Sequence, residues 1–340
     1  MEVPQFRFNV FLHTFPEYNC SDTDESVDWS TRGTKRPYFG SFCLCFGIVT
    51  ISLYSICVSV LFKMRSMPVY KIMLFLAAVD IADVFGNSIL FSIALFRGEV
   101  YCMHPIIHLY YAMFCQFFFM ASSMIYILIA INRFGELLTI GIISSIFKGS
   151  RAWIVLFLSL PLSFLAVFFS PPMLFNSTYH LLMFNPMITE GRYIFSNYLN
   201  TVLSISMPCI SFSIYVVMIC SMYIKHGRLA KASDSDALNE VALRMIVQSG
   251  IIITIHMTTC VIYEITQYIE MNEAVMYGAQ IGWMSVHGSP PFVYIIFNEA
   301  VRNRVKSMLT FSISMLPTPK NRSLVTVQPI ELMTSRDNTN

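Results

Sequence analysis

The chain has 340 residues, of which 55% are hydrophobic and only 12% are charged, and its formal net charge is +2 at pH 7. Soluble domains usually carry about 25% charged residues, so this composition excludes an ordinary soluble domain and indicates an integral membrane protein. The small net charge gives no argument for nucleic-acid binding, and we expect no nucleic-acid partner.

Residues 1–38 precede the first long apolar stretch. Pro4, Arg7 and Pro16 interrupt the beginning of this segment, so it lacks the uninterrupted apolar core of a cleavable signal peptide. We expect an extracellular N-terminal tail over 1–38, with the first membrane span directing insertion.

Seven long apolar stretches follow, each close to the roughly 20 residues that cross a bilayer. Their approximate limits are 39–62, 71–96, 105–132, 153–169, 193–224, 241–268 and 275–297. The sequence therefore predicts an all-α membrane protein, a seven-transmembrane helix bundle that contacts the lipid bilayer over residues 39–310. An odd number of spans places the two termini on opposite sides.

The basic residues give the orientation. Most of them fall in the connections after the first, third and fifth spans and directly after the seventh. The excess of Lys and Arg on cytoplasmic loops makes this set cytoplasmic and the N-terminus external. Arg32, Lys35 and Arg36 oppose this assignment, but acidic residues precede them. Two sequons, at Asn19 and Asn176, fall on the external side and are predicted glycosylation sites.

Beyond the seventh span, the apolar residues Val301, Val305, Met308 and Leu309 recur at helical spacing, with basic residues on the opposite face. This pattern predicts a short amphipathic helix on the inner leaflet. Residues 311–340 are polar, and we expect a disordered cytoplasmic tail there.

Ionisable residues inside the spans are scarce, and each is a functional candidate because charge is costly in the membrane. They are Asp80, Asp83, His256, Glu264 and His287. Two interpretations of Asp80 stay open: it belongs to a polar network, with or without a cation, that reorganises when helices move, or it makes satisfied structural hydrogen bonds.

The outer half of the third span is rich in aromatic residues, as a pocket for a small organic ligand requires. Polar and aromatic residues lie at comparable depth in the sixth and seventh spans. The candidate ligand-binding residues are Tyr111, Phe114, Gln116, Tyr263, Glu264, Gln280 and Trp283. Helix packing or an aromatic belt at the membrane interface is the alternative.

His104 and His108 are four positions apart, so on a helix they share one face and can reach a common metal ion. No third ligand is evident nearby in the sequence. Interfacial histidines at a helix start are the favoured interpretation, and we expect no metal and no other cofactor.

Several motifs resemble those of G-protein-coupled receptors. Asn132-Arg133-Phe134 is similar to the Asp-Arg-Tyr triplet at the inner end of the third span, and Leu76-Ala77-Ala78-Val79-Asp80 is similar to the Leu-Ala-x-x-Asp pattern of the second. Pro208 suits the proline of the fifth span, and Pro290-Pro291-Phe292-Val293-Tyr294 resembles Asn-Pro-x-x-Tyr. The usual span-six proline and the cysteine of the second external loop are missing.

This resemblance implies that Asn132, Arg133 and Phe134 engage a heterotrimeric G protein. It also implies an activation network of Asp80, Pro208, Pro290, Pro291 and Tyr294. We expect Arg133 at the membrane face, with its side chain extended toward water. Because Asn132 can offer only hydrogen bonds, any lock of the resting state should be weaker, or come from Glu136 or another helix. We therefore expect appreciable signalling without ligand.

A wider set of motifs in order and spacing resembles the nematode serpentine chemoreceptors, most closely class T, over positions 18 to 310. These motifs are Tyr18-Asn19-Cys20-Ser21, Trp29, Arg36-Pro37, Tyr70 to Leu76, Gly98 to Cys102, Pro105, His287-Gly288-x-Pro290, Phe297-Asn298 and Arg302. The resemblance implies a chemosensory receptor in the plasma membrane of a sensory-neuron cilium, with an unknown small-molecule ligand. It also suggests a disulfide between Cys20 and Cys102, both in segments expected outside the membrane, with two free thiols as the alternative.

Other functions are less well supported. A retinal protein needs a lysine in the seventh span, and 275–297 contains none. A ligand-gated channel or transporter would more readily place charges along several spans, although Asp80, Asp83 and Glu264 leave some room for it. A metal-dependent membrane hydrolase, the enzyme alternative, would depend on scattered histidines. We therefore expect a receptor and no enzymatic activity.

Overall fold

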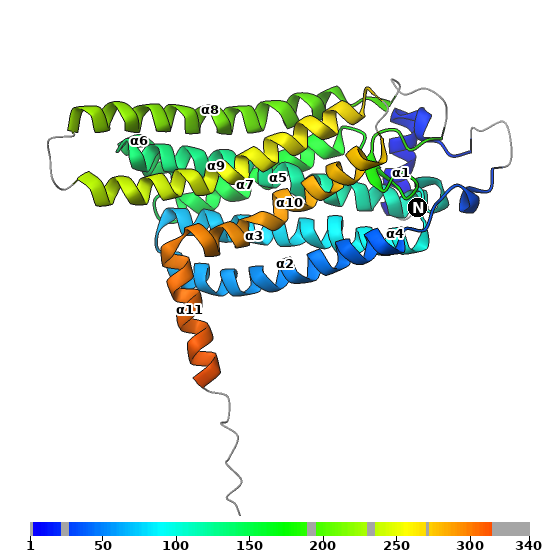
Figure 1. Ribbon diagram of the computed structural model, residues 1–340. Coiled ribbons are helices and arrows are strands. Elements are labelled where there is room, and N and C mark those ends of the chain that lie inside the picture. Colours follow the sequence, from blue (N-terminus) through cyan, green and yellow to red (C-terminus); the bar gives the residue numbers. More distant parts are fainter. Residues whose placement is uncertain (1–2, 22–26, 189–194, 230–234, 270–271, 315–340) are drawn as a thin grey trace, which may run out of the picture.

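A computed structural model describes residues 3–21, 27–188, 195–229, 235–269 and 272–314. Within these residues, seven long helical segments run side by side (Figure 1). They are α2 (Pro37–Met64), α3 (Pro68–Val84) continued by a π-helical turn η3 (Phe85–Leu90) and α4 (Phe91–Arg97), α5 (Pro105–Leu137), α7 (Arg151–Phe168), α8 (Tyr198–Leu229), α9 (Ser235–Thr266) and α10 (Glu273–Phe297). The predicted all-α bundle of seven helices is confirmed.

Proline sets the start of three of these helices. Pro37, Pro68 and Pro105 occupy the first positions of α2, α3 and α5, where the missing N–H has no helical partner to lose. The apolar stretches that follow continue the helices, because every backbone polar group inside a membrane must be paired.

Six helices of the described chain are long and apolar enough to cross a membrane: Pro37–Met64, Pro68–Arg97, Pro105–Leu137, Arg151–Phe168, Tyr198–Ile224 and Val247–Thr266. The remaining helix of the bundle, α10, packs against α9, α2 and α3. It is less apolar because it buries polar residues such as Gln280 and His287 inside the bundle.

The outer end of the bundle is capped. The N-terminal segment, expected to be a tail, contains α1 (Val3–Thr14) and the 3-10 turns η1 (Pro16–Tyr18) and η2 (Trp29–Thr31). Between α7 and α8, the strands β1 (Leu174–Asn176) and β2 (Leu181–Met183) form an antiparallel hairpin in which Phe175 pairs with Leu182. In Figure 1, α1 lies at the same end of the bundle as the start of α2.

The inner end carries two shorter helices, α6 (Gly141–Ile146) and α11 (Glu299–Ser314). Figure 1 shows α11 leaving the bundle across the direction of the long helices, as a helix on the membrane surface should. Val301 and Val305 are buried in the inner hydrophobic cluster, which matches the predicted amphipathic pattern. Most of the expected tail, residues 315–340, lies outside the described residues.

Candidate functional site

The outer mouth is closed by covalent and hydrogen-bonded contacts. A disulfide joins Cys20 to Cys102, as the resemblance suggested. Tyr18 donates a hydrogen bond to the Phe184 carbonyl (3.0 Å), and Tyr101 donates one to the Tyr18 carbonyl (3.3 Å). These contacts fix the N-terminal segment over the end of the bundle.

The hairpin forms the second part of this cap. The buried ring of His180 stacks on Tyr277 of α10, with ring centroids 4.1 Å apart. Arg36 forms an ion pair with Glu273 (3.0 Å) and also donates to the Thr178 carbonyl. Burial, and then the nearby Arg36 charge, lower the pKa of His180 to about 4, so the folded mouth favours the neutral ring.

A polar cluster around Glu264 lies between α8 and α9. The Glu264 carboxylate accepts hydrogen bonds from Asn200 (3.1 Å), Thr201 (2.6 Å) and Gln267. Asn200 also accepts a hydrogen bond from Gln116 of α5 (3.0 Å). Among the described residues, Glu264 therefore has neutral donors and no cationic ion-pair partner.

A second polar cluster occupies the centre of the bundle. The His287 ring lies between two carboxyl groups, with Nδ1 2.9 Å from Asp80 Oδ1 and Nε2 3.4 Å from Asp83 Oδ2. Tyr54 Oη is 2.8 Å from Asp80 Oδ2 and 2.7 Å from the His287 carbonyl oxygen. All four side chains belong to buried residues. A neutral imidazole carries one N–H, so both contacts are hydrogen bonds only if the cluster holds an additional proton.

The central cluster continues outward through side chains of α9 and α10. Trp283 Nε1 donates to Asp83 Oδ1 (3.2 Å), and Gln280 donates to the Asn87 carbonyl (2.9 Å). Tyr263 donates to the Gln280 side chain (3.2 Å). The Asn87 side chain in turn donates to Asp83 Oδ1. Three predicted ligand residues, Tyr263, Gln280 and Trp283, therefore belong to one network with Asp83.

The π-helical turn η3 lets α5 approach the second span closely. A Cβ atom on Gly86 would lie 2.8 Å from Cys115 Sγ and 3.0 Å from the Phe114 ring, so this contact requires glycine. Tyr111 donates a hydrogen bond to the Gly86 carbonyl (3.2 Å). Tyr111 and Phe114 therefore pack at a helix contact in this structure. Such π-helical turns are frequent at functional sites.

The inner end centres on Arg133. Because α5 continues to Leu137, Arg133 lies about one turn before the end of the helix, and the residue is only 7% exposed. The prediction that its side chain extends into water is wrong. Its Nη1 lies 3.6 Å from Glu136 Oε2, one of the possible partners that the sequence left open for a lock of the resting state.

A small cavity lies beside Arg133. It has a volume of about 20 Å³ and is lined in part by Tyr126, Tyr215, Gln248 and Tyr294, so it has room for about one water molecule. Asn132 is buried, whereas Phe134 is half-buried against α8 and α9 residues.

The predicted activation residues are divided among three helices, with Asp80 in α3. Tyr294, Pro290 and Pro291 are buried in α10, between the Asp80 cluster and the cavity beside Arg133. Pro208 is also buried, but it lies within a different helix, α8. The grouping of Pro208 with the other activation residues stays a prediction.

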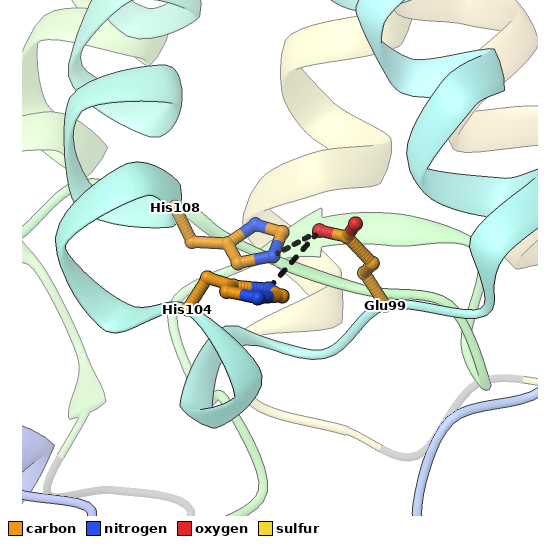
Figure 2. A group of neighbouring side chains, drawn as sticks. All are labelled: Glu99, His104 and His108. Atoms are coloured by element: carbon orange, nitrogen blue, oxygen red, sulfur yellow. Dashed lines mark ion pairs between the residues drawn. The ribbon is translucent and has the colours of Figure 1, made fainter. Parts of the chain in front are cut away.

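Three residues of types that bind metal ions meet at the outer mouth, where Glu99 and His104 lie beside His108. Figure 2 shows the three side chains directed toward one another. Glu99 Oε2 lies 2.9 Å from His108 Nε2 and 3.9 Å from His104 Nδ1. The His108 contact is the main cause that lowers the pKa of the Glu99 carboxyl.

The two sequons differ in accessibility. Asn19 is half-buried in the N-terminal segment. Asn176 is only 4% exposed, and its side-chain nitrogen faces the Pro186 carbonyl at 3.5 Å. Attachment of a glycan to Asn176 would therefore require that the hairpin rearrange.

Sequence reasoning missed several residues of these clusters. The sequence does not identify four residues as candidates, although each makes a polar contact described above: Tyr54, Asn200, Thr201 and Glu99. The sequence does contain an indication for Glu99, because it lies only five positions before His104 and could supply a third metal ligand. The turn at Gly98, where φ is +71°, brings its carboxylate back to the histidines.

Comparisons with known proteins agree with this architecture. The profile of the family described as "Serpentine type 7TM GPCR chemoreceptor Srt" matches residues 5–316. "Serpentine receptor class T-55" of Caenorhabditis elegans is 27% identical over 111 residues, an alignment that covers 32% of this chain and 30% of the relative. The aligned part therefore spans less than a third of that relative's length.

A solved structure supports the fold independently. Squid rhodopsin superposes with a TM-score of 0.59 at 16% sequence identity, covering 87% of this chain and 90% of the rhodopsin chain. At this identity the likeness shows the fold alone. The family match extends over nearly all the described helices, so the chain belongs to the Srt family of serpentine seven-transmembrane G-protein-coupled chemoreceptors.

Proposed function

We propose that this receptor binds an external small molecule in the outer half of the bundle and signals through a heterotrimeric G protein at Arg133. The observation that carries the proposal is the continuous run of buried polar and aromatic contacts from Tyr263 to the Asp80 cluster. This run ends near the cavity beside Arg133, to which Tyr294 contributes.

The Glu264 cluster is the part of the outer half that best suits ligand recognition. Its carboxylate is buried and is satisfied by the neutral side chains of Asn200, Thr201 and Gln267. A small molecule that carries a protonated amine or several hydrogen-bond donors could replace these contacts. The neighbouring aromatic residues Tyr263 and Trp283 would contact its apolar part, since ligand pockets combine apolar walls with a few polar groups.

Signal transmission requires that the ligand favour one arrangement of the helices over another. Contacts of Gln280 and Trp283 link α10 to the η3 segment and to Asp83. A ligand that disturbs these contacts shifts α10 and with it Tyr294. The Arg133–Glu136 ion pair is partly exposed, so breaking this one contact when Arg133 engages the G protein has a small cost.

The test is a second-messenger measurement in cells that express a panel of G proteins, together with a ligand screen. Arg133→Ala should abolish both basal and ligand-induced signals while surface expression stays normal. Arg151→Ala, an exposed arginine at the start of α7, is the matched control and should signal like the wild type. Wild-type signalling by Arg133→Ala would refute the role of Arg133.

A separate variant tests the proposed ligand site. Glu264→Gln keeps the shape of the side chain and removes its charge, and it should weaken the response to an amine ligand at least tenfold. Placement of the receptor in sensory-neuron cilia is part of the same proposal, and fluorescence imaging of the tagged receptor in the animal tests it.

A further inference from the structure

We propose that Glu99, His104 and His108 form an extracellular binding site for a divalent transition-metal ion, with Zn²⁺ as the best match. One donor atom from each of the three residues lies within 4.8 Å of the others. They come from the turn after α4 and from the beginning of α5, and they face one another in Figure 2. This site is separate from the Glu264 cluster and does not depend on the function proposed above.

The donor set fits zinc chemistry. Two imidazole nitrogens and one carboxylate oxygen are common zinc ligands, at about 2.0–2.2 Å from the metal. Tetrahedral binding at that length separates neighbouring donors by roughly 3.4 Å. The distances from Glu99 Oε2 to His108 and His104 are 2.9 and 3.9 Å, so shifts of about half an ångström bring both to the required value.

Glu99 is held in place for this role. Its backbone N–H donates to the Ala94 carbonyl (3.0 Å), and its carbonyl accepts from the Ser177 N–H of the hairpin (3.0 Å). Arg97 lies 3.3 Å from the other carboxylate oxygen, Oε1. Oε2 is therefore the oxygen left to face the two histidines.

The histidines differ in a way that suits metal entry. His108 is 2% exposed, and its ring stacks on Phe175 of β1, with centroids 5.9 Å apart and planes inclined by 7°. The His104 side chain is 50% exposed at the residue that precedes α5. Glu99 and His108 are thus positioned before the metal binds. The exposed His104 side chain can then move to complete the coordination of an ion that enters from solvent.

Metal binding would connect the turn after α4 to the first turn of α5. Cys102, which forms the disulfide with the N-terminal segment, lies between Glu99 and His104 in the chain. The ion would therefore stabilise the cap of the outer mouth. Three protein ligands leave one tetrahedral position for water or for a donor atom of an external molecule.

Zinc titration of the purified full-length receptor in lipid nanodiscs tests the proposal. The receptor is first treated with a chelator, without thiol reductants so that the Cys20–Cys102 disulfide stays intact. Zn²⁺ is then added in competition with a chromophoric zinc indicator. The wild type should bind one ion per receptor, and His104→Ala, His108→Ala and Glu99→Gln should each lower the affinity at least tenfold.

His104→Ala is the decisive variant because its side chain is half exposed, so its melting temperature without metal should equal that of the wild type. Zn²⁺ should raise the melting temperature of the wild type and leave that of His104→Ala unchanged. His13→Ala removes an exposed histidine of α1 and should bind zinc like the wild type. A wild type that binds no zinc, a His104→Ala variant with wild-type affinity, or an equal loss in His13→Ala would each overturn the proposal.

Discussion

The outer and inner halves of the bundle are stabilised in different ways. The outer half combines a disulfide, an antiparallel hairpin and a cluster of buried aromatic rings that includes Phe11, Tyr18 and Phe175. The inner half is packed mainly by aliphatic side chains, and the Arg133–Glu136 pair there spans 3.6 Å between neighbouring turns of one helix. The polar cluster around His287 lies between them.

This difference suggests that the outer half keeps one conformation and that the inner half can adopt two. In the outer half, close-packed aromatic rings and the disulfide bond favour a single conformation, because densely packed interiors resist rearrangement. Aliphatic packing around a small cavity, with an ion pair within one helix, permits a second arrangement at small cost. We therefore expect the outer half of the bundle to be rigid and the inner half, around Arg133, to be mobile, with the His287 cluster between them.

The largest expected effect is the loss of the central imidazole. His287→Ala leaves Asp80 and Asp83 buried without their common partner. Each buried polar group that loses a partner costs about 1–3 kcal/mol, so the two carboxyl groups together should cost about 2–6 kcal/mol. Thermal unfolding of the purified receptor measures this cost. His256→Ala is the control, since His256 is buried at similar depth but faces Ser123 at 3.0 Å and should cost about 1–3 kcal/mol. Equal losses of unfolding free energy in the two variants would show that the His287 cluster stabilises the bundle no more than an ordinary buried histidine.

The disulfide should contribute next. Replacing both Cys20 and Cys102 by Ser frees a loop with a sequence separation of 82, and we expect a loss of about 2–4 kcal/mol. The melting temperature under non-reducing conditions should fall, and limited proteolysis should cut the N-terminal segment first. Cys45→Ser, at an exposed thiol of α2, should change neither result. If the double variant melts like the wild type, the mouth is not held by this bond.

A smaller effect is expected at the inner end. Glu136→Gln removes the ion-pair partner of Arg133, a partly exposed interaction of about 0.5–1 kcal/mol. That energy corresponds to roughly a two- to fivefold rise in the active population, and therefore in basal signalling, when that population is small. Second-messenger assays at matched surface expression measure it. Glu17→Gln, the same change at the outer end, should leave basal signalling unaltered; an unchanged signal in Glu136→Gln would show that the pair is no lock.

The smallest expected effect is on how the melting temperature depends on pH, through His180 at the outer mouth. The pKa of His180 is lowered from 6.5 to about 4 in the folded state, so the folded cap favours the neutral ring. Its contribution to stability is complete above about pH 6.5 and is lost as the pH falls toward 4, because the unfolded state takes up the proton first. His180→Asn should flatten the decline of the melting temperature across this window.

Asparagine tolerates the positive φ of +42° at position 180. His13→Asn, at an exposed histidine of α1, controls for the loss of a histidine elsewhere in the cap. A decline in His180→Asn as steep as in the wild type would exclude His180 as its source.

The sequence predicted the helices well because hydropathy and length decide which segments span a membrane. It left open whether Asp80 belongs to a polar network, and it did not predict which side chains meet there. Asp80, Asp83 and His287 were each recognised as candidates, but their meeting around one ring depends on helix rotation, which hydropathy does not determine. The close approach at Gly86 and the folded N-terminal segment depend in the same way on tertiary contacts.

Arg133 illustrates the same limit. Its position at the end of an apolar run predicted a side chain in water, yet α5 continues one further turn and neighbouring helices bury it. Glu99 is the converse case, because only the left-handed turn at Gly98 brings it to His104 and His108. Local charge and spacing identify such residues but not their partners.

Nucleotide exchange on a purified G protein tests the central claim most directly. The receptor in nanodiscs, with Arg133→Ala and Arg151→Ala prepared alongside, is mixed with the G protein selected by the cell assay, and GTP-analogue uptake is followed. The wild type and Arg151→Ala should accelerate exchange, whereas Arg133→Ala should leave it at the rate of empty nanodiscs. Acceleration by Arg133→Ala equal to that of the wild type would contradict the claim.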